Sequence, residues 1–386
     1  MQAFGAATPR VMALVTSLAL LAACGAPRSA PSTVSASGVE PTSAASSATF
    51  DQALAAGKQE GKVSILTTVG DPRRQFFDDF GQKYGISVEV VQGASQAELV
   101  PKVDAERKAG QYLWDVVAHA PAVLFNGFRP LGALDPLRPG LLTPSDLDDA
   151  KWQGGFDGGW ADKDKAVAYT FVTRATFQVY VNRRFVTEAQ MNTIDQLWDP
   201  QWKGKIALDD PRVSGGGAQK ISALLRAKGE DKVRAFMRDQ QPVLTRDRRQ
   251  MAEWLVRGQY PISVGLSPEF LTSFASQGLD VSGIKPIDDG DPASIELGAD
   301  AGSLGLFSHA PHPNAAKALA TWVLSAEGQA LQSKLSGYNS RRTDVATVNP
   351  DEAVGSGKNY NHAAADLEES YPLQVRAIAL ANEVLH

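Results

Sequence analysis

The chain has 386 residues, a hydrophobic fraction of 43% and a formal net charge of −5 at pH 7. This length exceeds that of one ordinary domain and predicts about two, each large enough to bury its own core. Acidic and basic residues are interspersed along the chain, which argues against a nucleic-acid partner.

The N-terminal segment has the features of an export signal. Arg10 precedes an apolar stretch, residues 11–23, which as a helix would be about 20 Å long, too short to cross a bilayer core of roughly 30 Å. We therefore interpret residues 1–23 as a signal peptide. The sequence Leu-Ala-Ala-Cys-Gly around Cys24, the single cysteine of the chain, resembles the bacterial lipobox, whose cysteine carries the lipid. The alternative is a secretory signal with an incidental cysteine.

Residues 24–49 consist almost entirely of Ser, Ala, Pro, Thr and Gly. Such a segment cannot bury enough apolar surface to fold. We expect a flexible tether that joins the lipid anchor at Cys24 to the folded body.

The first part of the body alternates strand and helix patterns. Residues 63–67, 88–91 and 114–118 are typical of strands, and residues 72–84 and 98–108 are typical of helices. This order predicts a mostly parallel sheet with helices on both faces. Ligands of such sheets bind beyond the carboxyl ends of the strands, which makes Thr67, Thr68 and His119 candidate ligand contacts.

Two breaks in composition, at residues 154–165 and 283–300, divide the body. Between them, residues 166–181 and 260–264 have strand patterns, and helices are expected near residues 218–227, 232–238 and 250–257. After the second break we expect a strand at 302–307, helices within 314–335 and a closing helix within 364–385.

The segment from Trp198 to Gly217 (WDPQWKGKIALDDPRVSGGG) predicts a buried strand, a glycine-rich turn and the start of a helix. Ser214 is positioned to cap that helix, whose first free N–H groups would face the glycines. Such a corner suits an anion or another polar ligand. A sharp strand-to-helix corner without any ligand explains the residues equally well.

Four stretches of the body resemble bacterial ABC-transporter solute-binding proteins, in particular the cluster that binds ferric iron, thiamine and related organic ligands. They are the second-lobe stretch LWDPQWKGKIALDDPRVSGGG, the helix-to-strand step EWLVRGQYPISVG, the late helix HAPHPNAAKALATWVLSAEGQ and the stretch GYNSRRTDV. Their order and spacing, across residues 61–345, carry the resemblance.

The resemblance implies an α/β, two-lobed periplasmic-binding-protein (Venus flytrap) fold, with a mostly parallel sheet in each lobe and the solute in the cleft between them. Lobe one would comprise residues 50–164 with a return segment at 299–386, and lobe two residues 165–298. It also implies a monomer without a cofactor that delivers its solute to ABC permease subunits. A lipoprotein that presents its liganded form to a membrane sensor would use the same fold and stays an alternative.

In the ferric binders of this family, two adjacent tyrosines of lobe two bind the metal. The corresponding stretch here, Gly265 to Phe270, has no tyrosine, and no Tyr-Tyr pair occurs in the chain. We therefore favour an organic or inorganic anion as the solute and predict no metal site, with a ferric-iron binder as the alternative.

Several residue types suit such a polar solute. Arg174 lies within a strand-like run and could bind a carboxylate or phosphate in bidentate fashion, although a solvated edge arginine is its rival. Asp210 and Arg212 can pair with each other instead of with the solute. The complete set of predicted ligand contacts is Thr67, Thr68, His119, Arg174, Asp210, Arg212, Ser214, Gly215, Gly216, Ser267 and Ser303. The stretch Gly265 to Glu269 begins like a nucleophile elbow but lacks its final glycine, so we predict no enzyme.

Overall fold

The computed structural model describes residues 49–93, 95–355 and 360–385. The predicted signal peptide, Cys24 and all of the tether except Thr49 lie outside these ranges. No helix within them is both long and apolar enough to span a lipid bilayer.

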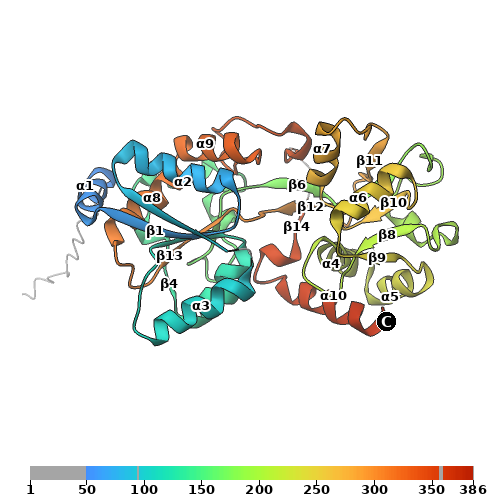
Figure 1. Cartoon of the computed structure of the whole chain (residues 1–386), viewed down its shortest axis with the longest axis horizontal. Coiled ribbons are helices and arrows are strands. Elements are labelled where there is room, and N and C mark those ends of the chain that lie inside the picture. Colours follow the sequence, from blue (N-terminus) through green and yellow to red (C-terminus); the bar gives the residue numbers. More distant parts are fainter. Residues whose placement is uncertain (1–48, 94, 356–359, 386) are drawn as a thin grey trace, which may run out of the picture. The chain divides into compact units, whose positions relative to one another are not determined.

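The first sheet combines strands from the N-terminal part of the body with β13, a strand from much later in the chain (Figure 1). Its six described strands have the order β2-β1-β3-β13-β4, and β5 also pairs with β13. The pairs β1–β2 and β1–β3 are parallel, whereas β13 is antiparallel to β3, β4 and β5. The strands are β1 (Lys62–Thr67), β2 (Ser87–Gln92), β3 (Val116–His119), β4 (Leu134–Asp135), β5 (Tyr169–Thr170) and β13 (Ser303–Phe307).

Helices cover both faces of this sheet, because alternate side chains of its buried strands point to opposite faces. Ile65 of β1 joins a core with Phe76 and Phe80 of α2, whereas Leu66 joins a core with Leu99 of α3. Trp322 of α8 packs against Phe76, with ring centroids 4.9 Å apart. The helices are α1 (Phe50–Glu60), α2 (Asp71–Tyr84), α3 (Gln96–Lys108), α8 (Pro313–Leu324) and α9 (Ala326–Ser336).

The second sheet has five described strands in the order β11-β7-β10-β8-β9. The pairs β8–β9 and β8–β10 are parallel, and β7 is antiparallel to β10 and β11. The elements are β7 (Val179–Asn182), β8 (Ile206–Asp209), β9 (Val243–Thr245), β10 (Ile262–Val264), β11 (Ile284–Pro286), α4 (Gly216–Lys228), α5 (Glu230–Asp239), α6 (Arg248–Arg257), α7 (Pro268–Ser276) and α10 (Tyr371–Val384).

Both sheets are mixed, and the prediction of mostly parallel sheets was wrong in this respect. The local β-α-β pattern fixes parallel pairing only between strands that a helix connects. Strands β13 and β7 instead enter their sheets from segments that cross between the two sheets, and they arrive in the opposite direction. Most of the predicted helices and strands are present within a few residues of their expected positions. The strand-like run 166–181 instead forms three short strands in three different sheets, and the closing helix expected from residue 364 begins at Tyr371.

A third sheet of three described strands joins the two larger ones. Strand β6 (Arg174–Phe177) pairs antiparallel with β12 (Ile295–Gly298), which pairs parallel with β14 (Asn361–His362). Strand β5 still belongs to the first sheet. The predicted boundary at residue 164 was therefore too early, and the crossing begins after Thr170.

The C-terminal helix α10 lies beside α4 and α5 (Figure 1). Its residues Ala377, Leu380 and Ala381 belong to the same core as Ile221 of α4 and Phe236 of α5. The prediction that residues up to 386 return to the first lobe was therefore wrong for this helix. Its apolar face is completed by the helices of the second sheet.

Candidate functional site

Two adjoining cavities lie at the crossing sheet and at the strand ends nearest to it. The first, which we call the Arg174 cavity, has a volume of about 140 Å³ and is lined by residues of β6, the start of α7 and the segment after β12. The second, the Arg73 cavity, has a volume of about 300 Å³ and is lined by the β1–α2 loop and by Tyr338. Asp300 lines both cavities, so the two form one candidate site.

Arg174 is the central buried charge of this site. Its side chain is 9% exposed, and its Nη2 atom lies 2.6 Å from Glu352 Oε1 and 4.0 Å from Glu269 Oε2. Its guanidinium also lies over the ring of Tyr338, 4.6 Å from the centroid. Burial, the largest single influence, lowers the pKa of Arg174, but the charge of Glu352, its hydrogen bond with Arg174 and the neighbouring Tyr338 and Asp300 together raise that pKa above its usual value. Arg174 is therefore a permanent cation at the crossing strand.

The Arg73 cavity adjoins the start of α2. Gly70, the N-cap residue, provides no side-chain cap for the first N–H groups of this helix. Arg73 is buried, donates from Nη1 to the backbone oxygen of Ala301 at 3.0 Å, and lies 4.0 Å from Asp300. Burial and the charge of Asp300 raise the pKa of Tyr338, which keeps that phenol protonated. The cavity thus presents hydroxyl, guanidinium and helix N-terminal groups.

The structure brings three of the predicted contacts into this site. Arg174 and Ser267 line the Arg174 cavity, and Thr68 lines the Arg73 cavity. Thr67 does not, because it is fully buried and its hydroxyl donates to the backbone oxygen of Ala118 at 2.8 Å. Ser303 is also fully buried and lines neither cavity.

His119 is a packed residue. Both ring nitrogens have backbone partners, since Nε2 lies 3.2 Å from the oxygen of Gly93 and Nδ1 accepts from the N–H of Ala120 at 2.8 Å. Burial lowers the pKa of His119. The ring is therefore neutral, and its position after β3 is explained without a ligand.

The corner at residues 209–217 differs from its prediction. The N-cap of α4 is Gly215, not Ser214, and it has no side-chain cap. The carboxylate of Asp209 instead accepts from the N–H of Gly217 at 3.0 Å. A Cβ atom on Gly217 would lie 1.8 Å from the oxygen of Asp209, and one on Gly216 would lie 2.2 Å from that of Gly265. Close backbone packing therefore explains these two glycines.

The charged side chains next to this corner form ion pairs with one another. Asp210 forms ion pairs with Arg212 and Arg246, both at 2.9 Å. Hydrogen bonds from Arg212 hold the pKa of Asp210 at about 2. Ser214 is exposed and lines a different cavity, together with residues of α3 and Tyr371. Asp210, Arg212 and Ser214 are thus outside the Arg174 and Arg73 cavities, as are Gly215 and Gly216.

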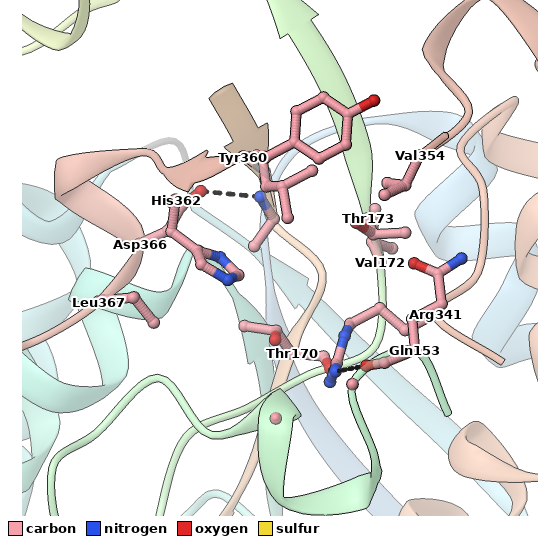
Figure 2. Close-up of a pocket in the computed structure, with 15 residues that line it drawn as sticks. Gln153, Thr170, Val172, Thr173, Arg341, Val354, Tyr360, His362, Asp366 and Leu367 are labelled. Carbon is pink, nitrogen blue, oxygen red and sulfur yellow. Dashed lines mark hydrogen bonds between the residues drawn. The ribbon is translucent and has the colours of Figure 1, made fainter. Parts of the chain in front are cut away.

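A third cavity, of about 330 Å³, adjoins the Arg174 cavity and shares Gly298 and Asp366 with it. Figure 2 shows Arg341 and Gln153 on one side of this cavity, and His362 and Asp366 on the other. Arg341 donates to the backbone oxygens of Thr170 and Gln153. Asp366 accepts from the N–H of Ala299 at 2.7 Å, and burial raises its pKa to about 7. These hydrogen bonds tie the crossing segments to the rest of the body.

Arg73, Asp300 and Tyr338 line the site but were not predicted from the sequence. Arg73 lies in the helix expected at residues 72–84, and Asp300 is the last residue of the break in composition at 283–300. A signal was available for Tyr338, which is the second residue of the GYNSRRTDV stretch of the family resemblance. Within the described ranges, no three His, Cys, Asp or Glu side chains are placed to hold a metal ion.

A protein-family model described as "Bacterial extracellular solute-binding protein" matches residues 75–361, which is well over half of the chain. The matched region contains β6, β12 and most of the residues that line the two cavities. No curated protein sequence gives a significant match.

Solved structures share the fold at low sequence identity. An iron and citrate complex from Trichodesmium has 17% identity and a TM-score of 0.64, with 84% of this chain and 99% of that chain covered. A ferric binding protein from Campylobacter jejuni has 14% identity and a TM-score of 0.61, with 84% and 99% covered. An ABC transporter structure from Clostridium perfringens has 13% identity and a TM-score of 0.64, with 84% and 100% covered.

Proposed function

Because the chain belongs to the bacterial extracellular solute-binding protein family, we propose that it captures a small polar solute in the Arg174 and Arg73 cavities and delivers it to the permease of an ABC importer. The single observation that carries this proposal is that the two cavities share Asp300 at the crossing sheet. Hinge motion at crossing strands would let a bound solute stabilise a closed form.

The solute would carry an anionic group in the Arg73 cavity. The uncapped start of α2 supplies free N–H groups there, and Thr68 and Arg73 supply a hydroxyl and a guanidinium. A helix N-terminus with such neighbours favours negative charge. We also propose that the protein acts as a monomer without catalysis and is anchored to the membrane through lipidated Cys24.

The proposal is tested by a thermal-shift screen of small polar metabolites. A solute at 100 times its dissociation constant is expected to stabilise the protein by about 2.7 kcal/mol. Ser267, the N-cap residue before α7, makes no side-chain cap and lines the Arg174 cavity. Ser267→Phe is expected to fill that cavity and abolish the shift. Thr272→Phe adds the same bulk at an exposed position of α7 and should keep the shift. Equal shifts in both variants would contradict the proposed site.

Ferric iron is the alternative solute, and it is tested separately. Stoichiometric Fe³⁺ is expected to produce no visible phenolate-to-iron absorption band. Among the described residues, Tyr338 is the only tyrosine that lines either cavity, and burial keeps its phenol protonated. An absorption band that Tyr338→Phe removes would establish iron binding at this site. The protein could instead present its bound solute to a membrane sensor through the same site. In that case the liganded protein would bind a receptor and not a permease.

A further inference from the structure

The charges of the site do not balance. Two guanidinium groups, those of Arg73 and Arg174, lie within 4.0 Å of three carboxylates, those of Asp300, Glu269 and Glu352. Only the pair of Arg174 with Glu352 is close, at 2.6 Å. The pairs with Asp300 and Glu269 are both at 4.0 Å, where an ion pair is loose. One negative charge is thus left without a matching cation.

A buried acceptor without a donor lies in the same cavity. Gln178 is 6% exposed and lines the Arg174 cavity. Its Nε2 atom donates to Gln219 at 2.9 Å, but its Oε1 atom is buried and has no hydrogen-bond partner. Leaving a buried acceptor unpaired costs about 1–3 kcal/mol. A ligand in the cavity that donates a hydrogen bond to this oxygen would remove that cost.

The accessible carboxylates are available to the same ligand. The side chain of Glu269 is 58% exposed and that of Asp300 is 39% exposed, and both line the Arg174 cavity. A protonated amine supplies a positive charge together with N–H donors, and therefore meets both the charge and the acceptor requirement. A metal ion would need several converging ligands, and no such group of side chains exists among the described residues.

We propose that the solute carries a protonated amine, which binds in the Arg174 cavity between Glu269, Asp300 and the side-chain amide oxygen (Oε1) of Gln178. This inference rests on the proposed solute-binding function and narrows it to zwitterionic or amine-bearing solutes. The anionic group of such a solute would lie in the Arg73 cavity. Asp300, which lines both cavities, would then orient the two ends.

The test uses two metabolite pools, one of amine-bearing compounds and one of anions without an amine, both with EDTA present. The purified protein is expected to gain thermal stability with the amine pool. In Glu269→Gln and Asp300→Asn the amount of pool that gives half the shift is expected to rise about 10-fold or more, because each variant removes one charge partner. Glu253→Gln, which removes an exposed carboxylate of α6 paired with Arg257 at 2.6 Å, is the matched control and should not change it.

Three other outcomes of this test would contradict the amine assignment, and one of them would also contradict the proposed capture of a solute. A shift only with the anion pool would overturn the amine assignment and leave solute binding intact. An amine-dependent shift that is unchanged in both Glu269→Gln and Asp300→Asn would also overturn it. If neither pool stabilises the protein, both the amine assignment and the proposed capture of a small solute fail.

Discussion

Replacement of Arg174 by methionine is expected to lower the free energy of unfolding by about 3–5 kcal/mol, because it leaves a buried carboxylate without its partner. The side chains of Arg174 and Glu352 are only 9% and 12% exposed, and their closest atoms are 2.6 Å apart. Glu352 Oε2 has no hydrogen-bond partner among the described residues, so the contact with Arg174 is the close charge partner that this substitution removes. Chemical denaturation followed by tryptophan fluorescence measures the loss.

A double variant separates this charge effect from packing. Arg174→Met with Glu352→Gln removes both charges and is expected to recover much of the stability lost in Arg174→Met. Its coupling energy follows from the cycle with Glu352→Gln alone. If the two single substitutions simply add, the ion pair contributes little and Arg174 acts mainly through its contact with Tyr338. Arg184→Met, which removes an exposed ion pair with Asp280, should change stability by less than about 1 kcal/mol.

The case of Arg174 shows what sequence patterns can and cannot predict about this site. An arginine inside an apolar strand run is conspicuous, and for this reason the sequence predicts Arg174 as a candidate ligand contact. Its partner Glu352 is 178 residues away in the chain, between segments with no strong periodicity. Local spacing carries no information about such a contact, so the pairing became visible only in the structure.

The prediction of the helix cap at residues 209–217 was wrong for a different reason. Glycines before a helix can serve either a ligand or close backbone packing, and the sequence favours neither. The structure shows Gly216 and Gly217 packed against the backbone of Gly265 and Asp209. Asp209, the last residue of β8, caps the helix from outside the local capping pattern. The strand and the helix were predicted correctly because apolar periodicity is a local signal. The cap was predicted wrongly because its acceptor, Asp209, lies outside the usual capping position.

The family resemblance predicted the two-lobed fold. It did not predict the antiparallel strands in each sheet or the packing of α10 against the second sheet's helices. Strands that return from a crossing segment pair antiparallel, and α10 completes the core of the second sheet. Both features depend on where a distant segment arrives. The helices and strands were predictable because each buries a periodic face.

The free energy of unfolding is expected to depend on pH through Glu296, which lies within the crossing strand β12. Its side chain is fully buried, and neither carboxylate oxygen has a hydrogen-bond partner. The charged groups that influence it are Lys220 and Arg226, both on α4. Lys220 is also fully buried and donates to the backbone oxygen of Ala293 at 2.7 Å. Burial raises the pKa of Glu296 from 4.5 to about 7, although the charge of Lys220 opposes this rise.

The sign of the pH dependence follows from this raised pKa. Between pH 4.5 and about 7, the folded protein keeps a proton on Glu296 that the unfolded chain has released. The unfolded state therefore binds fewer protons, and stability falls as the pH rises through this interval. Above the folded pKa both states are ionised and the dependence ends. A rise of this size corresponds to roughly 3 kcal/mol between the two limits.

Glu296→Gln removes the titrating group and retains nearly the same shape. We expect the variant to resemble the parent protein near pH 4.5 and to be more stable at pH 8 by up to about 3 kcal/mol. Asp366 has a pKa of about 7 in the same region, so the variant should keep a shallower slope over the same interval. Denaturant unfolding at pH 5, 6, 7 and 8 measures both effects. Glu89→Gln, at an exposed position of β2, is the control and should leave the slope unchanged. Parallel stability curves for Glu296→Gln and the parent protein would show that Glu296 stays ionised in the folded state, with Lys220 as its effective counter-charge.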